Sequence, residues 1–258
     1  MKKLAIVNEK GGVGKTLLAT QLAFYASLQK GKRVVVFDFD QQGNTSNCLR
    51  EHAACTCSGV TLFDVMTKGV VPSERGDLLL IPASQDLLSL ERQTSEHQKY
   101  IKNLLHVIRA LESDFDFAVF DTNPSPDIRA VGAIALASHV IIPIQLNREA
   151  LDGVKLMFNK LHGAKKINPT LEFLGLLPNL VEKKPFQIEN FKQLVSTSSS
   201  LLLKDADGNF LKIGSATALA EAQAESRPVW EGEKSTSART WRQVQPVFET
   251  ILLRINCA

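Results

Sequence analysis

The sequence predicts an α/β protein with a doubly wound, mainly parallel sheet and helices on both faces. Two observations support this class: short apolar runs alternate with amphipathic segments along the chain, and the first apolar run ends in a glycine-rich turn. Strands of a parallel sheet are usually continuous apolar runs, because helices cover both faces of the sheet. Alternating strands and helices are typical of doubly wound folds.

The first strand–helix–strand unit lies within the first 40 residues. Residues 4–7 form an apolar run that predicts a buried strand, and residues 15–29 have the apolar spacing of a helix packed on a sheet. Gly31 ends that helix, and the β-branched run 33–39 predicts the second strand. This order places the glycine-rich loop at the first turn of a βαβ unit.

The alternation continues to the end of the chain. No internal repeat interrupts it, and the serine patch at 197–200 is too short to link two domains, so we expect one domain over residues 1–258. The Asp-Gly pair within 204–209 predicts a turn. Further strands are predicted at 77–83, 116–121, 139–145 and 171–178, and further helices at 100–111, 150–166, 190–203 and 240–255.

The composition is that of an ordinary soluble globular protein, with 44% hydrophobic and 22% charged residues. No apolar run approaches the roughly 20 residues that a transmembrane helix needs. Residues 4–7 are too short for the core of a signal peptide, so we expect a cytoplasmic protein. The net charge of +3 permits contact with nucleic acid but does not require it.

The four cysteines do not indicate a metal site. Cys55 and Cys57 are separated by one residue, fewer than zinc ligands usually have between them, and no histidine follows at ligand spacing. We therefore expect reduced thiols, as in most cytosolic proteins.

The glycine-rich loop, residues 7–16 (VNEKGGVGKT), is suited to phosphate binding. Gly14, Lys15 and Thr16 match the end of the P-loop pattern G-x-x-x-x-G-K-[ST], although Glu9 stands where its first glycine is expected. Glycines let backbone N–H groups turn toward a phosphate, and the helix that follows adds its positive N-terminal end. Lys15 would contact the β- and γ-phosphates, and the Thr16 hydroxyl would bind Mg²⁺.

Residues 10–16 (KGGVGKT) resemble the deviant Walker A motif of the ParA/MinD group of P-loop ATPases, and Asn8 fits the usual N-x-K-G-G start. The resemblance implies that two subunits sandwich two molecules of Mg·ATP and that Lys10 reaches across to the partner's nucleotide. Such a cation offsets phosphate charge only when both subunits and ATP are present. The resemblance also implies nucleotide contacts by Gly11, Gly12, Val13, Gly14, Lys15, Thr16 and Leu17.

Residues 37–46 (FDFDQQGNTS) look like the family's D-x-D-P-Q-G-N-x-[ST] segment, with Gln41 where proline is common. The resemblance implies that Asp40 orients the attacking water and that Asp38 supports the metal shell. The segment follows the second predicted strand, at the edge where open α/β sheets place their sites.

Residues 117–121 (FAVFD) resemble the Walker B strand, which places Asp121 near Mg²⁺. The family often continues D-x-P-P, whereas this chain has Asn123 at the first proline position. The catalytic candidates are Lys10, Lys15 and Asp40. The candidate metal ligands are Thr16 and Asp121.

Weaker matches extend over most of the remaining chain. Residues 175–179 resemble a later strand that leads to the base-binding region, so Asn179 is expected near adenine. The family's DNA-contacting segment often reads I-P-R-x-x-R-x-x-E-A, but Ser215 and Ala218 stand where those arginines are common. Phosphate contact needs charge rather than fixed geometry, so other basic residues could replace them. The candidates are Lys183, Lys184, Lys204, Lys212, Arg239 and Arg242.

The resemblance is closest to small ParA proteins of plasmid and chromosome partition. It implies an ATP-dependent homodimer that binds DNA non-specifically, associates with the nucleoid and hydrolyses ATP slowly. A centromere-binding ParB-type protein would stimulate hydrolysis, and no membrane is expected as a partner.

Two alternatives stay open. A MinD-like ATPase would position a protein complex at a membrane or pole through a short basic amphipathic helix at its C terminus. Residues 244–258 carry one basic residue, Arg254, so a closing core helix is favoured there. The changed residues Gln41 and Asn123 also allow a nucleotide switch that does not hydrolyse ATP.

Overall fold

The computed structural model describes residues 1–148 and 161–257. In this part of the chain seven strands form one sheet, in the order β3-β4-β2-β5-β1-β6-β7. Every pair of neighbouring strands is parallel, which confirms the predicted fold class. The strands are β1 (Lys2–Ile6), β2 (Val34–Asp38), β3 (Cys55–Cys57), β4 (Leu78–Ile81), β5 (Phe117–Asp121), β6 (His139–Ile144) and β7 (Glu172–Pro178).

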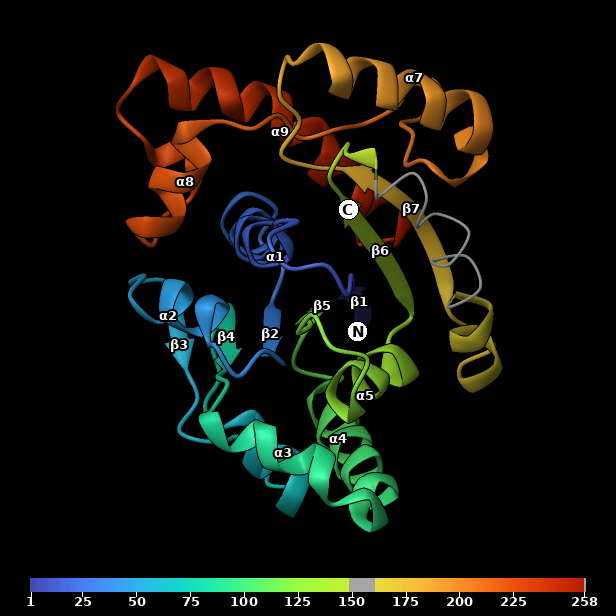
Figure 1. The fold of residues 1–258 in the computed structure, drawn as a ribbon. Coiled ribbons are helices and arrows are strands. Elements are labelled where there is room, and N and C mark those ends of the chain that lie inside the picture. The colour runs from blue at the N-terminus through green and yellow to red at the C-terminus, as the bar shows by residue number, and fades with distance from the viewer. Residues whose placement is uncertain (149–160, 258) are drawn as a thin grey trace.

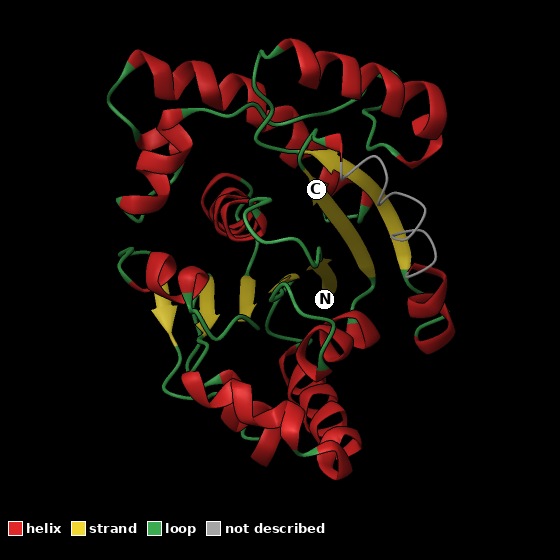
Figure 2. Cartoon of the chain, in the orientation of Figure 1, coloured by secondary structure: helices red, strands yellow, loops and turns green. Residues whose placement is uncertain are grey.

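Helices cover both faces of the sheet, as Figures 1 and 2 show. The side chains of β2 alternate between two cores, because successive residues of a strand point to opposite faces. Val34 and Val36 lie in the first core, whereas Val35 and Phe37 lie in the second. Four helices cover the first core: α1 (Lys15–Phe24), α2 (Asn44–Arg50), α8 (Thr217–Ala224) and α9 (Ser235–Arg254). Three helices cover the second core: α3 (Leu62–Lys68), α4 (His97–Leu111) and α5 (Ile128–Leu136). The helix α7 (Pro185–Ser198) packs on β6 and β7.

The last helix, α9, is part of the first core. Val244, Phe248 and Ile251 are buried there together with Leu22 of α1, which confirms the predicted closing helix. The helix begins five residues before its predicted start, because most side chains of its first turns are polar and exposed and show no apolar periodicity. No helix in the described part of the chain has the length and apolar character that a membrane crossing requires.

The C-terminal region is also tied to α1 by hydrogen bonds. The side chain of Gln21 is buried, its Nε2 donates to the carbonyl of Arg227 at 3.0 Å, and its Oε1 accepts from the N–H of Val229 at 2.8 Å. The hydroxyl of Thr20 donates to Oε1 of Gln223 at 2.8 Å. These bonds fix the helix that starts at the glycine-rich loop against residues some 200 positions later.

The predicted strands correspond to six of the seven observed ones. The exception, β3, has three half-buried residues, too few for a recognisable pattern. Most of the helix predicted over 150–166 lies outside the described residues, and residues 161–167 are helical. The α7 helix begins five residues before its prediction, at Pro185, whose fixed φ suits the first helical position. The helices α2, α3, α5 and α8 were not predicted, since seven to nine residues show too few apolar periods.

One glycine of β7 allows another segment to pack directly on the strand. Gly175 has a φ of +144°, and the pairing of β6 with β7 shifts register beside it. A Cβ at this position would lie 2.7 Å from the backbone nitrogen of Leu203 and 2.9 Å from its Cα. The same nitrogen donates to the carbonyl of Leu176 at 2.9 Å, so the backbone around Leu203 cannot withdraw without losing this bond.

We therefore expect Gly175→Ala to lower the free energy of unfolding by about 1–3 kcal/mol, because both the backbone conformation and the close approach penalise a Cβ. Gly163→Ala is the matched control: Gly163 is helical, and its added Cβ would meet nothing within 4 Å. The control should be neutral or stabilise by up to about 1 kcal/mol. Urea unfolding followed by circular dichroism measures both, and equal effects of the two substitutions would contradict the assignment.

Candidate functional site

The predicted site residues converge at the carboxyl edge of the sheet. The glycine-rich loop connects β1 to α1, and Asp121 at the end of β5 is in register with both Ile6 of β1 and Asp38 of β2. Open α/β sheets place their ligands at this edge, outside the carboxyl ends of the strands. The segments that sequence motifs singled out are therefore neighbours in space.

Two amide side chains, those of Asn8 and Gln145, hold the glycine-rich loop by hydrogen bonds. Nδ2 of Asn8 donates to the carbonyl of Pro143 at 2.8 Å, and its Oδ1 accepts from the N–H of Lys10 at 2.8 Å. Nε2 of Gln145 donates to the carbonyl of Gly12 at 2.9 Å. These contacts hold the loop against β6 and the residue that follows it.

Any residue other than glycine would be strained at position 14. Its φ is +84°, and a Cβ there would lie 2.3 Å from Nδ2 of Asn179. That nitrogen donates to the carbonyl of Val13 at 2.8 Å. Asn179 is thus packed under the loop, where its Oδ1 is buried without a hydrogen bond among the described residues. The predicted adenine contact of Asn179 stays a prediction.

Lys15 is enclosed by its own loop. The side chain is 8% exposed, and Nζ donates to the carbonyl of Asn8 at 2.9 Å and to that of Lys10 at 3.4 Å. Burial lowers the pKa of Lys15, while the negative charges of Asp121 and Asp40 act in the opposite direction. The ammonium group is weakly solvated, and an anionic phosphate at the loop would be a stronger partner than the two neutral carbonyls.

Asp121 connects three elements through one oxygen. Its Oδ2 accepts from the hydroxyl of Thr16 at 2.9 Å and from the hydroxyl of Thr45 at 2.7 Å, which joins β5 to α1 and α2. Burial raises the pKa of Asp121 to about 6, although these two hydroxyls and the charge of Lys15 oppose the shift. Thr45 was missed by the sequence analysis, because it occupies a variable position of the motif.

The other oxygen of Asp121, Oδ1, is buried without a hydrogen bond among the described residues. A buried carboxylate oxygen with no partner usually indicates a missing ligand or water. Together with the Thr16 hydroxyl, it is a donor set that suits Mg²⁺, which binds few protein oxygens and retains water or phosphate oxygens. The described residues contain no group of three or more His, Cys, Asp or Glu that would hold a metal by themselves.

Asp38 is a support for the neighbouring loop. Its Oδ1 accepts from the N–H of Asp40 at 3.1 Å, and its Oδ2 accepts from the N–H of Ser46 at 2.8 Å and from the Ser46 hydroxyl at 2.6 Å. Burial, with the charge of Asp121 as the second cause, raises the pKa of Asp38 to about 7. These contacts shape the loop between β2 and α2, and the support of a metal shell that the resemblance implied stays a prediction.

Asp40 lies at the start of that loop and is partly exposed. Its Oδ1 accepts from the N–H of Gln42 at 3.0 Å. Its charge is close enough to act on the pKa values of both Lys15 and Asp121. Asp40 therefore borders the same centre as the lysine and the candidate metal ligands, while its role toward water stays a prediction.

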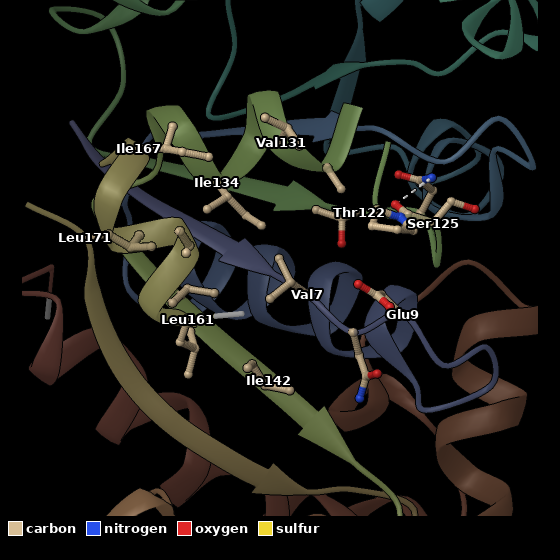
Figure 3. Close-up of a pocket in the computed structure, with 17 residues that line it drawn as sticks. Val7, Glu9, Thr122, Ser125, Val131, Ile134, Ile142, Leu161, Ile167 and Leu171 are labelled. Atoms are coloured by element: carbon tan, nitrogen blue, oxygen red, sulfur yellow. Dashed lines mark hydrogen bonds between the residues drawn. The ribbon is translucent and has the colours of Figure 1, made fainter. Parts of the chain in front are cut away.

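A separate apolar cavity of about 450 Å³ lies beside the loop. Figure 3 shows Val131, Ile134 and Leu161 around it, with the polar residues Glu9 and Ser125 at one end. None of the predicted catalytic, metal or phosphate-contacting residues lines this cavity. The cavity is therefore distinct from the predicted phosphate site.

The six basic candidates for DNA contact lie at the surface of the C-terminal half in different environments. Nζ of Lys184 lies 2.6 Å from Oε2 of Glu182, so the ion pair locally neutralises the charge of the lysine. Lys204 and Lys212 lie over aromatic rings, at 4.8 Å and 4.9 Å from the ring centres. Arg239 and Arg242 are exposed on α9, three positions apart and thus on one side of the helix.

Comparisons with known proteins agree with the geometry. A family model described as an AAA domain matches residues 1–173. Protein IncC of Escherichia coli is 31% identical over 264 residues, which cover 100% of this chain and 71% of the relative. The chromosome-partitioning ATPase Soj of Treponema pallidum is 30% identical over 203 residues, which cover 76% of this chain and 78% of the relative. In fold, the ATP complex of a Cyanothece McdA variant matches with a TM-score of 0.79 at 17% identity, over 100% of this chain and 97% of the other.

The two buried carboxyls predict a pH dependence of stability. Their pKa values are raised above the ordinary 3.8, to about 6 for Asp121 and about 7 for Asp38, so the folded state binds their protons more tightly than the unfolded chain. This stabilisation is present below about pH 4 and is lost as the pH rises through about 6 and 7. Asp121→Asn removes one carboxyl and its repulsion of the other. The wild type, measured without ligand, should therefore lose more stability than the variant as the pH rises. The difference in melting temperature, variant minus wild type, should increase by about 3 °C or more from about pH 4 to about pH 7.

Thermal unfolding at a series of pH values measures this difference. Asp207→Asn, at an exposed turn, is the matched control and should leave the difference constant. Parallel curves for Asp121→Asn and the wild type would show that the buried carboxyls do not govern the pH dependence.

Proposed function

This chain belongs to the ParA/Soj family of partition ATPases, and on that premise we propose that ATP assembles it into a homodimer that binds DNA without reading its sequence. Family membership gives it ATP binding and ATP hydrolysis. The proposal adds Mg²⁺ as the metal, a dimer with two nucleotides at its interface, and a centromere-binding ParB-type protein that stimulates hydrolysis. The cycle would move plasmid or chromosomal DNA.

The observation that carries the dimer is the separate placement of the two loop lysines. The amine of Lys15 donates to carbonyls of its own loop, a position that would serve the nucleotide of its own subunit. The backbone of Lys10 is fixed on both sides, because its N–H donates to Asn8 and its carbonyl accepts from Lys15. With its backbone held in this way, we expect the side chain of Lys10 to reach the phosphates of a facing subunit, where charge neutralisation would link nucleotide binding to pairing.

Hydrolysis in this site would depend on positioning and charge. The N–H groups of the loop, the N-terminal end of α1 and the Lys15 amine would hold the phosphates. Thr16 and Asp121 would hold Mg²⁺, which neutralises the charge that develops on the transferred phosphoryl group. The carboxylate of Asp40, one oxygen of which accepts from the N–H of Gln42, would accept a hydrogen bond from the attacking water.

DNA contact would use charge at new positions. Ala218, which stands where the family pattern often has arginine, is 1% exposed in α8, so its side chain is part of the core. Arg239 and Arg242 are exposed on α9, where their charges would be accessible to phosphates. Because phosphate contacts are set by charge and reach, such a relocation keeps sequence-independent binding.

A MinD-like role at a membrane or pole is the weaker proposal. The apolar side of α9, with Val244, Phe248 and Ile251, is buried in the first core. A helix of this kind cannot lie in a membrane surface without opening that core. Partition is therefore the function that this geometry favours.

Size-exclusion chromatography with light scattering tests the dimer. With Mg²⁺ and a slowly hydrolysed ATP analogue, the wild type should elute at twice the monomer mass. Lys10→Ala should bind the analogue and stay monomeric, whereas Lys15→Ala should lose analogue affinity by about 100-fold, since it removes the charge within the loop. A stable nucleotide-dependent dimer of Lys10→Ala would contradict the cross-subunit role.

Salt-dependent DNA binding tests the surface on α9. With Mg²⁺·ATP present, Arg239→Ala/Arg242→Ala should weaken binding to random duplex DNA and reduce the slope of log affinity against log salt by about 2. Lys102→Ala/Arg109→Ala, two exposed basic residues of α4 beside the second core, is the matched control and should keep the slope. An unchanged slope in the α9 variant would place the DNA surface elsewhere.

A further inference from the structure

A buried arginine joins two loops that border the proposed hydrolytic centre. Arg129 lies in the first turn of α5 and is 3% exposed. Its Nε donates to Oδ2 of Asp127 at 3.0 Å, and Nη2 donates to the same oxygen. Its Nη1 donates to Oε1 of Gln41, which belongs to the loop after β2. One side chain thus contacts its own helix and a loop 88 positions earlier in the chain.

The same set of contacts continues to the loop after β5. Asp127 caps the start of α5, since its side chain accepts from the N–H groups of Arg129 and Ala130. Its Oδ2 also accepts from Nδ2 of Asn123 at 2.9 Å. Asn123 is buried and follows Asp121 by two residues. The bridge Gln41–Arg129–Asp127–Asn123 therefore runs from the neighbour of Asp40 to the loop that follows Asp121.

The two ends of this bridge are the positions where the chain departs from the pattern it resembles. Proline is common at the positions of Gln41 and Asn123, and a proline side chain can neither accept the bond from Arg129 nor donate the bond to Asp127. Both departures thus introduce an amide group, and both amide groups contact one buried ion pair. One structural device accounts for two separate changes in sequence.

The bridge also has backbone support on the side of Asp40. Nε2 of Gln85 donates to the carbonyl of Gln41 at 3.2 Å, and the N–H of Gln42 donates to Asp40 at 3.0 Å. A displacement of Gln41 would therefore move Asp40 with it. A guanidinium group that is almost fully buried needs acceptors for its N–H groups, so it holds Gln41 in place.

We propose that Arg129 is a positioning residue for ATP hydrolysis, which acts by holding the loop of Asp40 at a fixed distance from the strand end that carries Asp121. This inference rests on the proposed role of Asp40 in orienting water. Misplacement of a reacting group by about 1 Å can reduce a rate by about 100-fold, so a link of this kind affects turnover without contacting the nucleotide.

Steady-state ATP hydrolysis tests the proposal. Gln41→Ala breaks the link to the loop but leaves the pair of Arg129 with Asp127 and a partly exposed site, so the protein should fold normally. We expect its kcat to fall by about 10- to 100-fold with a KM within about twofold of the wild type. Arg129→Met should show the same split, and Arg129→Lys, which keeps the charge but loses the planar fork, should lie between. Arg109→Met, an exposed arginine of α4, is the matched control and should keep wild-type kinetics.

The double variant Gln41→Ala/Arg129→Met separates a shared link from two independent effects. If both residues act through one contact, its kcat should be no lower than that of the more impaired single variant. A wild-type kcat for Gln41→Ala, or effects that multiply in the double variant, would overturn the proposal, even if Arg129→Met fails to fold. Asp40→Ala is measured in parallel. If Asp40→Ala still hydrolyses ATP, the proposed role of Asp40 itself is overturned. If Asp40→Ala loses hydrolysis while Gln41→Ala keeps the wild-type kcat, only the role of the bridge is overturned.

Discussion

The site is organised around one oxygen of a buried carboxylate. Oδ2 of Asp121 accepts hydroxyl groups from Thr16 of the phosphate loop and Thr45 of α2, so three elements meet at one atom. The strand that ends in Asp121 pairs with β1 and β2 on its two sides, which gives this atom a central place in the sheet. We therefore expect a substitution at Asp121 that removes these hydrogen bonds to affect both the phosphate loop and the start of α2.

The two buried carboxyls of the site have different tasks because their surroundings differ. Asp38 gives both oxygens to groups of its own loop, whereas Asp121 retains one oxygen without a hydrogen bond among the described residues. Burial raises the pKa of both. Asp38 offsets part of the cost of burial by accepting hydrogen bonds from Asp40 and Ser46, whereas Oδ1 of Asp121 has no such bond among the described residues. Asp38 therefore supports its own loop, whereas Oδ1 of Asp121 would be available to a ligand.

Sequence analysis predicted the fold and the residues whose roles depend on local order. Parallel strands are continuous apolar runs, and the phosphate loop is a contiguous motif, so both can be recognised without tertiary information. β3 and the short helices escaped because few residues define them. Thr45, Gln145 and Arg129 were not identified because each contacts a partner 76 or more positions away, and no local pattern predicts such a contact. For Thr45, the variable position that it occupies in the motif was a further reason. The sequence pattern did not indicate that both oxygens of Asp38 accept hydrogen bonds from Ser46 and the backbone, and the support of a metal shell by Asp38 stays a prediction.

The bonds of Gln21 have a consequence for how the chain can be divided. The family model ends at residue 173, but Gln21 donates to Arg227 and accepts from Val229, and α1 shares its core with α9. The nucleotide-loop helix thus has one of its sides completed by the last third of the sequence. A chimera that joins the motif-bearing part of this protein to the C-terminal part of a relative would have to carry the complementary surface for α1 as well, since sequence motifs and folding units have different borders here.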